Sequence, residues 1–135
     1  MPNVSKIKGT ENLTEIDIAL TKALRSINPT NTNKKRVWLD IISDVLLQHH
    51  ALTTRKWLSG VLPMLKNKGF TVLAVINPQM HPPEESQAIQ GLFDGEIVIQ
   101  ERETSMGLQR TLRIRRLYNQ KYLDNEITFN RDKLT

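Results

Sequence analysis

Two short runs of apolar residues constrain the fold of this 135-residue chain more than any other feature. The first is Val37–Ile42, interrupted only by Asp40, and the second is Thr71–Ile76. Both are short and rich in β-branched residues, which favours strands buried on both faces of a parallel sheet. Helical patterns surround and separate them, and strands that alternate with helices predict an α/β fold with right-handed crossovers.

The helical segments have recognisable start and stop signals. Asn12–Glu15 has capping-box spacing, and the apolar stripe that follows predicts a helix that stops at Asn28-Pro29. Between the strands, Thr53 or Thr54 is expected to cap a second helix, which Pro63 should kink or restart because proline removes a backbone donor. A third, shorter helix is expected over residues 84–93.

The hydrophobic period changes in the last third of the chain. Apolar and polar residues alternate over 96–102 and 111–115, on either side of a Met106-Gly107 turn, which predicts an antiparallel β-hairpin. A final strand is expected over 126–129, and the hairpin should extend one edge of the parallel sheet. Residues 1–10 are polar and unpatterned, so we expect a flexible lead-in to one domain.

Composition limits the classes of function. The net charge is +5, and two basic runs stand out: four arginines within seven residues (Arg110, Arg113, Arg115, Arg116) and Lys34–Arg36. Either run can be a solvated strand edge or loop, or it can contact nucleic acid, and charge alone does not decide. There is no cysteine and no apolar run of about 20 residues, so we expect a cytoplasmic protein without membrane attachment.

Several segments resemble a known family. The strand that ends in Asp40, followed by Ile-Ile-Ser43-Asp44, resembles the Walker B strand of RecA-type ATPases. The segments ENLTEIDIALTKAL, TTRKWLSGVLPMLKNKGFTVLAVINPQMHPPEE, QAIQGLFDGEIVIQERE and TLRIRRLYNQKYLDNEITF are similar to KaiC-like archaeal and bacterial ATPases. The resemblance covers residues 11–131. It implies a partial RecA-like parallel sheet, with residues 11–135 forming the C-terminal half of such a domain.

The resemblance also suggests roles for four residues. Asp40 takes the position of the Walker B carboxylate, which holds Mg²⁺ beside ATP, although an aspartate at a strand end can also cap a loop. Ser43 and Asn77 take positions near the nucleotide, with a helix N-cap and a turn as their structural alternatives. Arg116 takes the position of a finger that reaches the nucleotide of a neighbouring subunit, and Tyr118 stands where the family has a second basic residue.

The phosphate-binding loop of such ATPases has no counterpart in this sequence. No G-x-x-x-x-G-K-[ST] motif occurs, so nothing presents consecutive backbone N–H groups and a lysine to the phosphates. We expect the chain to be a fragment or a truncated protein that binds no cofactor and hydrolyses no ATP alone. It should act through homo-oligomers or with a P-loop-bearing partner, and the open sheet edge should be filled by residues 96–102 or by a second copy. The alternative is a non-catalytic module that binds nucleic acid or protein.

Overall fold

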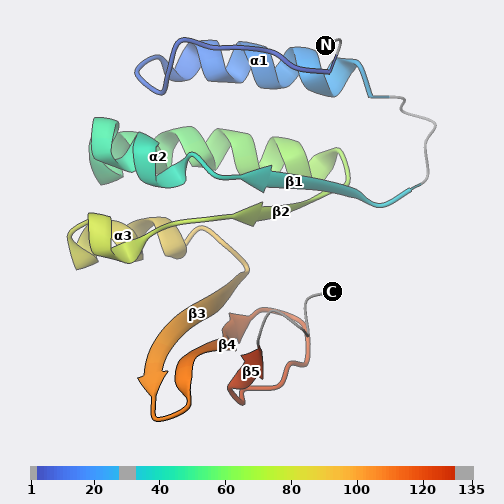
Figure 1. Ribbon diagram of the computed structural model, residues 1–135. Helices are drawn as coiled ribbons and strands as arrows, with labels where there is room; N and C mark the ends of the chain where they lie inside the picture. The colour runs from blue at the N-terminus through green and yellow to red at the C-terminus, as the bar shows by residue number, and fades with distance from the viewer. Residues whose placement is uncertain (1–2, 28–32, 130–135) are drawn as a thin grey trace. The chain divides into compact units, whose positions relative to one another are not determined.

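The computed structural model describes residues 3–27 and 33–129 and consists of two compact units, Met1–Leu92 and Phe93–Thr135. The first unit contains, in order, α1 (Leu13–Arg25), β1 (Lys35–Leu39), α2 (Ile42–Asn67), β2 (Phe70–Ala74), the 3₁₀ helix η1 (Pro78–Met80) and α3 (Pro83–Gln90) (Figure 1). The second contains β3 (Gly95–Thr104), β4 (Gly107–Leu117) and β5 (Ile127–Phe129). The predicted α/β class is confirmed. Within the described residues, no helix is both long enough and apolar enough to cross a membrane.

Helix α1 begins where the capping signal predicts. The side chain of Asn12 accepts a hydrogen bond from the backbone N–H of Glu15 over 3.2 Å, which satisfies one of the free donors of the first turn. The indole N–H of Trp57 in α2 donates to Asp17 Oδ1 over 2.7 Å, so α1 lies against α2. The expected stop at Asn28-Pro29 lies outside the described residues.

Strands β1 and β2 pair in parallel, as the sequence predicts. Their register runs from Lys35 opposite Phe70 to Leu39 opposite Ala74, and α2 connects them as the crossover (Figure 1). The core lies where α2 faces this sheet and α3, and its fully buried side chains are Ile42, Val45, Leu46, Leu58, Leu65 and Ile89. Burial of such side chains is the main stabilising term of the unit.

The prediction that both strands are buried on both faces is wrong. Side chains along β1 alternate between half-buried and exposed until Leu39, and those along β2 alternate throughout. Trp38 is 65% exposed and Leu73, its partner in register, is 46% exposed. Helix α2 packs against one face of the sheet, and within the first unit the side chains of the other face stay exposed. Apolar composition alone does not tell which faces are covered.

Helix α2 is interrupted at a place that the sequence does not indicate. His50 has φ 60° and ψ 177°, which separates two helical segments, while the backbone remains helical through Pro63. The prediction of a restart at Pro63 is therefore wrong, because buried residues such as Val61 and Leu65 hold the helix to the core on both sides of the proline, and a kink there stays a prediction. The predicted cap at Thr53 or Thr54 is wrong as well. Both residues are helical, and the buried Thr54 hydroxyl donates to the Val45 carbonyl over 3.5 Å.

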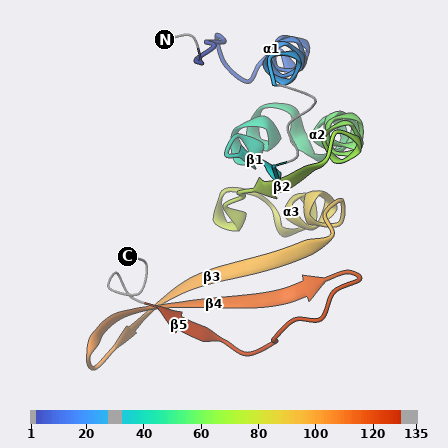
Figure 2. The same ribbon diagram turned by 90° about the vertical axis from the view of Figure 1, so that its right-hand side faces the viewer.

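The second unit is a separate antiparallel sheet with the strand order β3-β4-β5 (Figure 2). The hairpin turns at Met106-Gly107, as predicted, and Gly107 has a φ of 109°, which glycine adopts without steric cost. The hairpin and the final strand are confirmed. The expected extension of the parallel sheet is not found among the described strands, which form two separate sheets, β1-β2 and β3-β4-β5.

Candidate functional site

The carboxyl ends of β1 and β2 meet at one edge of the parallel sheet. Asp40 directly follows β1, and the backbone N–H of Val75 donates to the Leu39 carbonyl over 2.9 Å, which continues the pairing one residue beyond β2. In open α/β sheets, ligands bind outside this edge. The loops 40–43 and 75–81 are therefore the place to look for a site.

Two of the predicted site residues are in direct contact at this edge. The backbone N–H of Asn77 donates to the Ser43 hydroxyl oxygen over 2.9 Å, which joins the first turn of α2 to the loop after β2. The side-chain oxygen of Asn77 accepts from the backbone N–H of Gln79 over 3.1 Å and caps η1. The turn that the sequence offered as the structural alternative for Asn77 is thus present. The Ser43 hydroxyl can still donate a hydrogen bond, because no group in the described residues accepts one from it.

Asp40 lies beside this pair with its carboxylate exposed to solvent. Among the described residues, no hydrogen bond or ion pair involves this carboxylate, and no cluster of three or more potential metal ligands occurs. A single carboxylate of this kind fits Mg²⁺, which keeps several waters and takes only one or two protein ligands beside substrate phosphates. It does not fit Zn²⁺, which needs three or four protein ligands.

The loop after β2 also holds a buried histidine that sequence reasoning did not single out. The His81 side chain is 8% exposed, and neither ring nitrogen has a hydrogen-bond partner among the described residues. The hydroxyl of Ser86 in α3 is also buried and has no hydrogen-bond partner among the described residues. Buried polar atoms without partners are rare in native proteins. The local sequence Met80-His81-Pro82 does not indicate that His81 is buried.

Arg116 belongs to the second unit, whereas Asp40, Ser43 and Asn77 belong to the first. It is half-buried at the end of β4, and its Nη2 donates to the Phe93 carbonyl over 3.1 Å. Its Nη1 donates to the Tyr118 hydroxyl over 3.4 Å, and the guanidinium carbon lies 5.1 Å from the centre of the Tyr118 ring. The tyrosine at the position of the family's second basic residue thus contacts Arg116 itself. A finger role for Arg116 stays a prediction.

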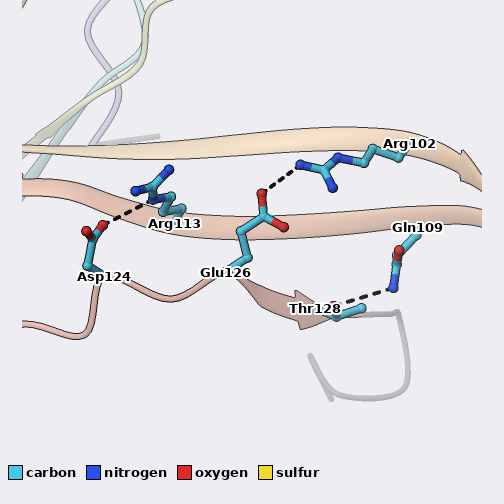
Figure 3. A network of polar contacts seen from close by, with 6 residues as sticks. All are labelled: Arg102, Gln109, Arg113, Asp124, Glu126 and Thr128. Atoms are coloured by element: carbon cyan, nitrogen blue, oxygen red, sulfur yellow. Dashed lines mark hydrogen bonds and ion pairs between the residues drawn. The ribbon is translucent and has the colours of Figure 1, made fainter.

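The other arginines of the β3-β4-β5 sheet are paired with carboxylates. Figure 3 shows Arg102 with Glu126 and Arg113 with Asp124, at 2.7 and 3.1 Å. The remaining pairs are Arg110–Glu101 at 2.7 Å and Arg115–Glu96 at 3.3 Å. The hydrogen bond to Asp124 raises the pKa of Arg113 above its ordinary value. Residues 93–129 contain six acidic and six basic side chains, so the arginine-rich strand carries no excess charge in its setting.

The comparisons with known proteins identify the family. The family model described as "ATPase: KaiC" matches residues 2–132, which is nearly the whole chain. The chain belongs to the KaiC ATPase family. Among solved structures, the crystal structure of the KaiC-like protein PH0186 from the hyperthermophilic archaeon Pyrococcus horikoshii OT3 matches with a TM-score of 0.63 and 19% identity. No curated protein sequence matches the chain.

The structural match covers 88% of this chain and 50% of the PH0186 chain. At this level of identity the likeness concerns the fold, and it confirms that the chain has the architecture of part of a KaiC-like protein. The present KaiC-family chain therefore spans about half the length of the relative that it matches. Family membership associates ATP and Mg²⁺ with the family as a whole.

Proposed function

We propose that this chain is the Walker B-bearing half of a KaiC-like ATPase domain, which contributes to an ATP site only when a P-loop-bearing segment completes the sheet. The observation that carries the proposal is the exposed Asp40 carboxylate beside the bonded Ser43–Asn77 pair, at the carboxyl edge of two parallel strands. The family match supports the ATPase assignment. The sequence has no motif that could cradle phosphates, which supports the dependence on a second segment.

Each site residue then has a defined task. Asp40 would hold Mg²⁺ through water, and the bound ion would neutralise charge on the β- and γ-phosphates of ATP. The Ser43 hydroxyl proton can be donated to a phosphate oxygen or to a metal-bound water, because Ser43 accepts from Asn77 and donates to no described group. Asn77 fixes the position of that hydroxyl through its backbone N–H. Arg116 would act toward the nucleotide of a neighbouring subunit.

The surroundings of the site favour assembly. Strands β1 and β2 pair only with each other among the described strands, so the outer edge of each strand has no described partner strand. Unpaired strand edges are templates for further pairing. The proposed partner is a P-loop-bearing half-domain or, in a homo-oligomer, another copy of this chain. The proposed location is the cytoplasm, where a cysteine-free ATPase module needs no oxidising environment.

Titration calorimetry with Mg-ATP tests the proposal. The isolated chain should bind with a dissociation constant weaker than about 10 µM, equivalent to about −7 kcal/mol. Adding a P-loop-bearing half of a KaiC-like domain in trans should restore Mg²⁺-dependent binding, and Asp40→Asn should reduce it. The matched control is Asp44→Asn, an exposed carboxylate one turn further into the same loop and helix. Tight binding by the isolated chain, or equal losses in both variants, would show that the phosphates and the metal are held elsewhere.

A non-catalytic binding module remains the second candidate function. The arginine-rich strand β4 gives it little support, because acidic partners match its arginines. The observation that favours it is a different group of basic residues, at the opposite edge of the parallel sheet.

A further inference from the structure

Basic side chains gather where the strands of the parallel sheet begin. We define the amino-edge cluster by five residues that lie just before or at the start of β1 and β2: Lys34, Lys35, Arg36, Lys66 and Lys68. Because the two strands are parallel and Lys35 lies opposite Phe70, the segment that leads into β1 and the end of α2 that leads into β2 meet at the same edge. Figure 1 shows the tails of both strand arrows and the last turn of α2 at one end of this layer.

Helix α1 adds two more cations at the same end. The Thr10 carbonyl lies 2.8 Å from His49 Nε2, and Asp17 Oδ1 lies 2.7 Å from Trp57 Nε1. These contacts join residues 39 and 40 positions apart, so α1 and α2 run side by side in the same direction. Lys22 and Arg25, in the last turn of α1, therefore lie at the end of the layer that also contains Lys66.

The carboxylates of the described part of this unit follow the strands, precede α1 or lie in its first half, toward the other end: Glu11, Glu15, Asp17, Asp40, Asp44, Glu84 and Glu85. The segments 22–27, 33–38 and 64–72, which form the amino edge, contain none. The first unit is thus electrically polarised, with a cationic end opposite the candidate nucleotide site.

Helix termini explain only part of this arrangement. Cations in the last turn of a helix interact favourably with the helix dipole, which accounts for Lys22, Arg25 and Lys66. Lys34 and Arg36 belong to no helix and are exposed, and Lys68 is exposed beyond the last turn of α2. Their charges add to an edge that is already positive and therefore repel one another. Such an accumulation attracts polyanions.

An exposed aromatic ring lies on the same face of the sheet as Arg36, further along β1 toward its carboxyl end. Arg36 and Trp38 are two positions apart on β1, so their side chains leave the same face of the sheet, and Trp38 is 65% exposed. Cationic side chains that track a phosphate backbone, combined with an aromatic ring on which a base can stack, are the features of single-strand nucleic-acid binding. An acidic protein would need the charge but not the exposed ring, whereas an anionic membrane could use both and is separated by the experiment below.

We propose that the amino edge of the β1–β2 sheet binds the phosphate backbone of single-stranded nucleic acid, with a base stacked on Trp38. This surface is distinct from the candidate nucleotide site and does not depend on it, because Asp40, Ser43 and Asn77 lie at the carboxyl edge of the same strands. Phosphate contacts from four to six of the cations give the binding a steep dependence on salt.

Fluorescence anisotropy of a labelled 20-nucleotide single strand tests the proposal on the full chain. Binding at 50 mM salt should weaken with a slope of log K against log salt of roughly −3 to −4, as expected for about five phosphate contacts on a single strand. The combined variant Lys34→Glu, Arg36→Glu and Lys68→Glu should lose at least about tenfold in affinity and flatten that slope. The matched control, Lys6→Glu, Lys8→Glu and Lys56→Glu, makes the same change in net charge at exposed positions outside the amino edge and should retain most of the affinity.

Variants of Trp38 separate stacking from charge without disturbing the core. Trp38→Ala should reduce affinity by roughly five- to a hundredfold at constant salt dependence, and Trp38→Phe should recover much of the loss. Circular dichroism of every variant verifies folding. Equal losses in the two charge-reversal variants would overturn the proposal in favour of a diffuse positive field. Binding to anionic vesicles or to polyglutamate without binding to the oligonucleotide would overturn it in favour of another partner.

Discussion

The backbone N–H of Asn77 donates a hydrogen bond to the Ser43 hydroxyl oxygen over 2.9 Å, which ties the loop after β2 to the first turn of α2. The two residues are 34 positions apart, so the bond fixes the geometry of the carboxyl edge through a tertiary contact. Because the Ser43 oxygen accepts this bond, the hydroxyl proton is left to be donated to another group. Asp40 precedes Ser43 by three residues, between β1 and α2.

Removing this contact gives the first prediction. Ser43→Ala should lower the free energy of unfolding by about 1 kcal/mol, since it leaves the Asn77 N–H without its acceptor in a partly exposed site. Urea denaturation followed by circular dichroism measures the change. The matched control is Ser59→Ala, because the Ser59 hydroxyl bonds only to the Arg55 carbonyl in its own helix and should contribute less. Equal effects of the two substitutions would mean that the Ser43–Asn77 bond does not stabilise the edge.

The break in α2 gives a second prediction. A non-glycine residue with positive φ costs about 1–3 kcal/mol, and His50 has φ 60°. His50→Gly should therefore raise the free energy of unfolding by about 1 kcal/mol. The loss of the exposed contact between His50 Nδ1 and Glu85 Oε1, 3.4 Å apart, should offset little of this gain. In the control, Gln48→Gly at an exposed and regular helical position should destabilise by about 1 kcal/mol. Destabilisation by both substitutions would argue for a regular helix at residue 50.

Local patterns predicted most of the elements, because their causes are local. The Asn12 cap, the Gly107 turn and the apolar stripes of the helices depend on neighbours within a few residues. The parallel pairing of β1 with β2 follows from the helix between them. The exposure of Trp38 could not be predicted in this way, because it depends on which elements cover the second face of the sheet. The break at His50 left no trace in the sequence, since histidine has no special preference for that conformation.

In the candidate site as well, some features could be predicted from the sequence and others depend on tertiary packing. The meeting of Ser43 with Asn77 follows from the rule that parallel strands bring their carboxyl ends to one edge. The neutralisation of β4 does not follow from its run of arginines, because their partners Glu96 and Asp124 come from other strands and loops. The sequence also gave no reason to expect a buried His81, because burial of the loop after β2 arises from tertiary packing.

His81 gives the third prediction. Its ring is 8% exposed and its nitrogens have no partner in the described residues, so its polarity opposes folding. His81→Leu, which replaces the imidazole with an apolar group of similar size, should raise the free energy of unfolding by about 1 kcal/mol. Met80→Leu is the control, since Met80 is 42% exposed and its replacement should change little. A loss of more than about 1 kcal/mol for His81→Leu would show that the imidazole is bonded to water or to another group in solution.

The last prediction concerns Arg116 in a domain completed by a P-loop-bearing half. If Arg116 acts on the nucleotide of a neighbouring subunit, Arg116→Ala should reduce ATP turnover by about 10³-fold or more, which is the scale of arginine fingers. ATP affinity should change less, because a finger acts mainly on charge that develops in the transition state. To act in this way, the guanidinium must leave the Phe93 carbonyl, 3.1 Å away, and the face of Tyr118.

Arg113→Ala is the matched control for Arg116→Ala. Arg113 lies on the same strand but on its exposed face, and it is paired with Asp124. Its loss should leave turnover and stability nearly unchanged, because exposed ion pairs contribute only about 0–1 kcal/mol. Steady-state turnover and calorimetric affinity for ATP, measured on both variants, separate the outcomes. Equal reductions at both positions would assign the effect to the general electrostatics of β4, and unchanged turnover in Arg116→Ala would mean that Arg116 has a structural role.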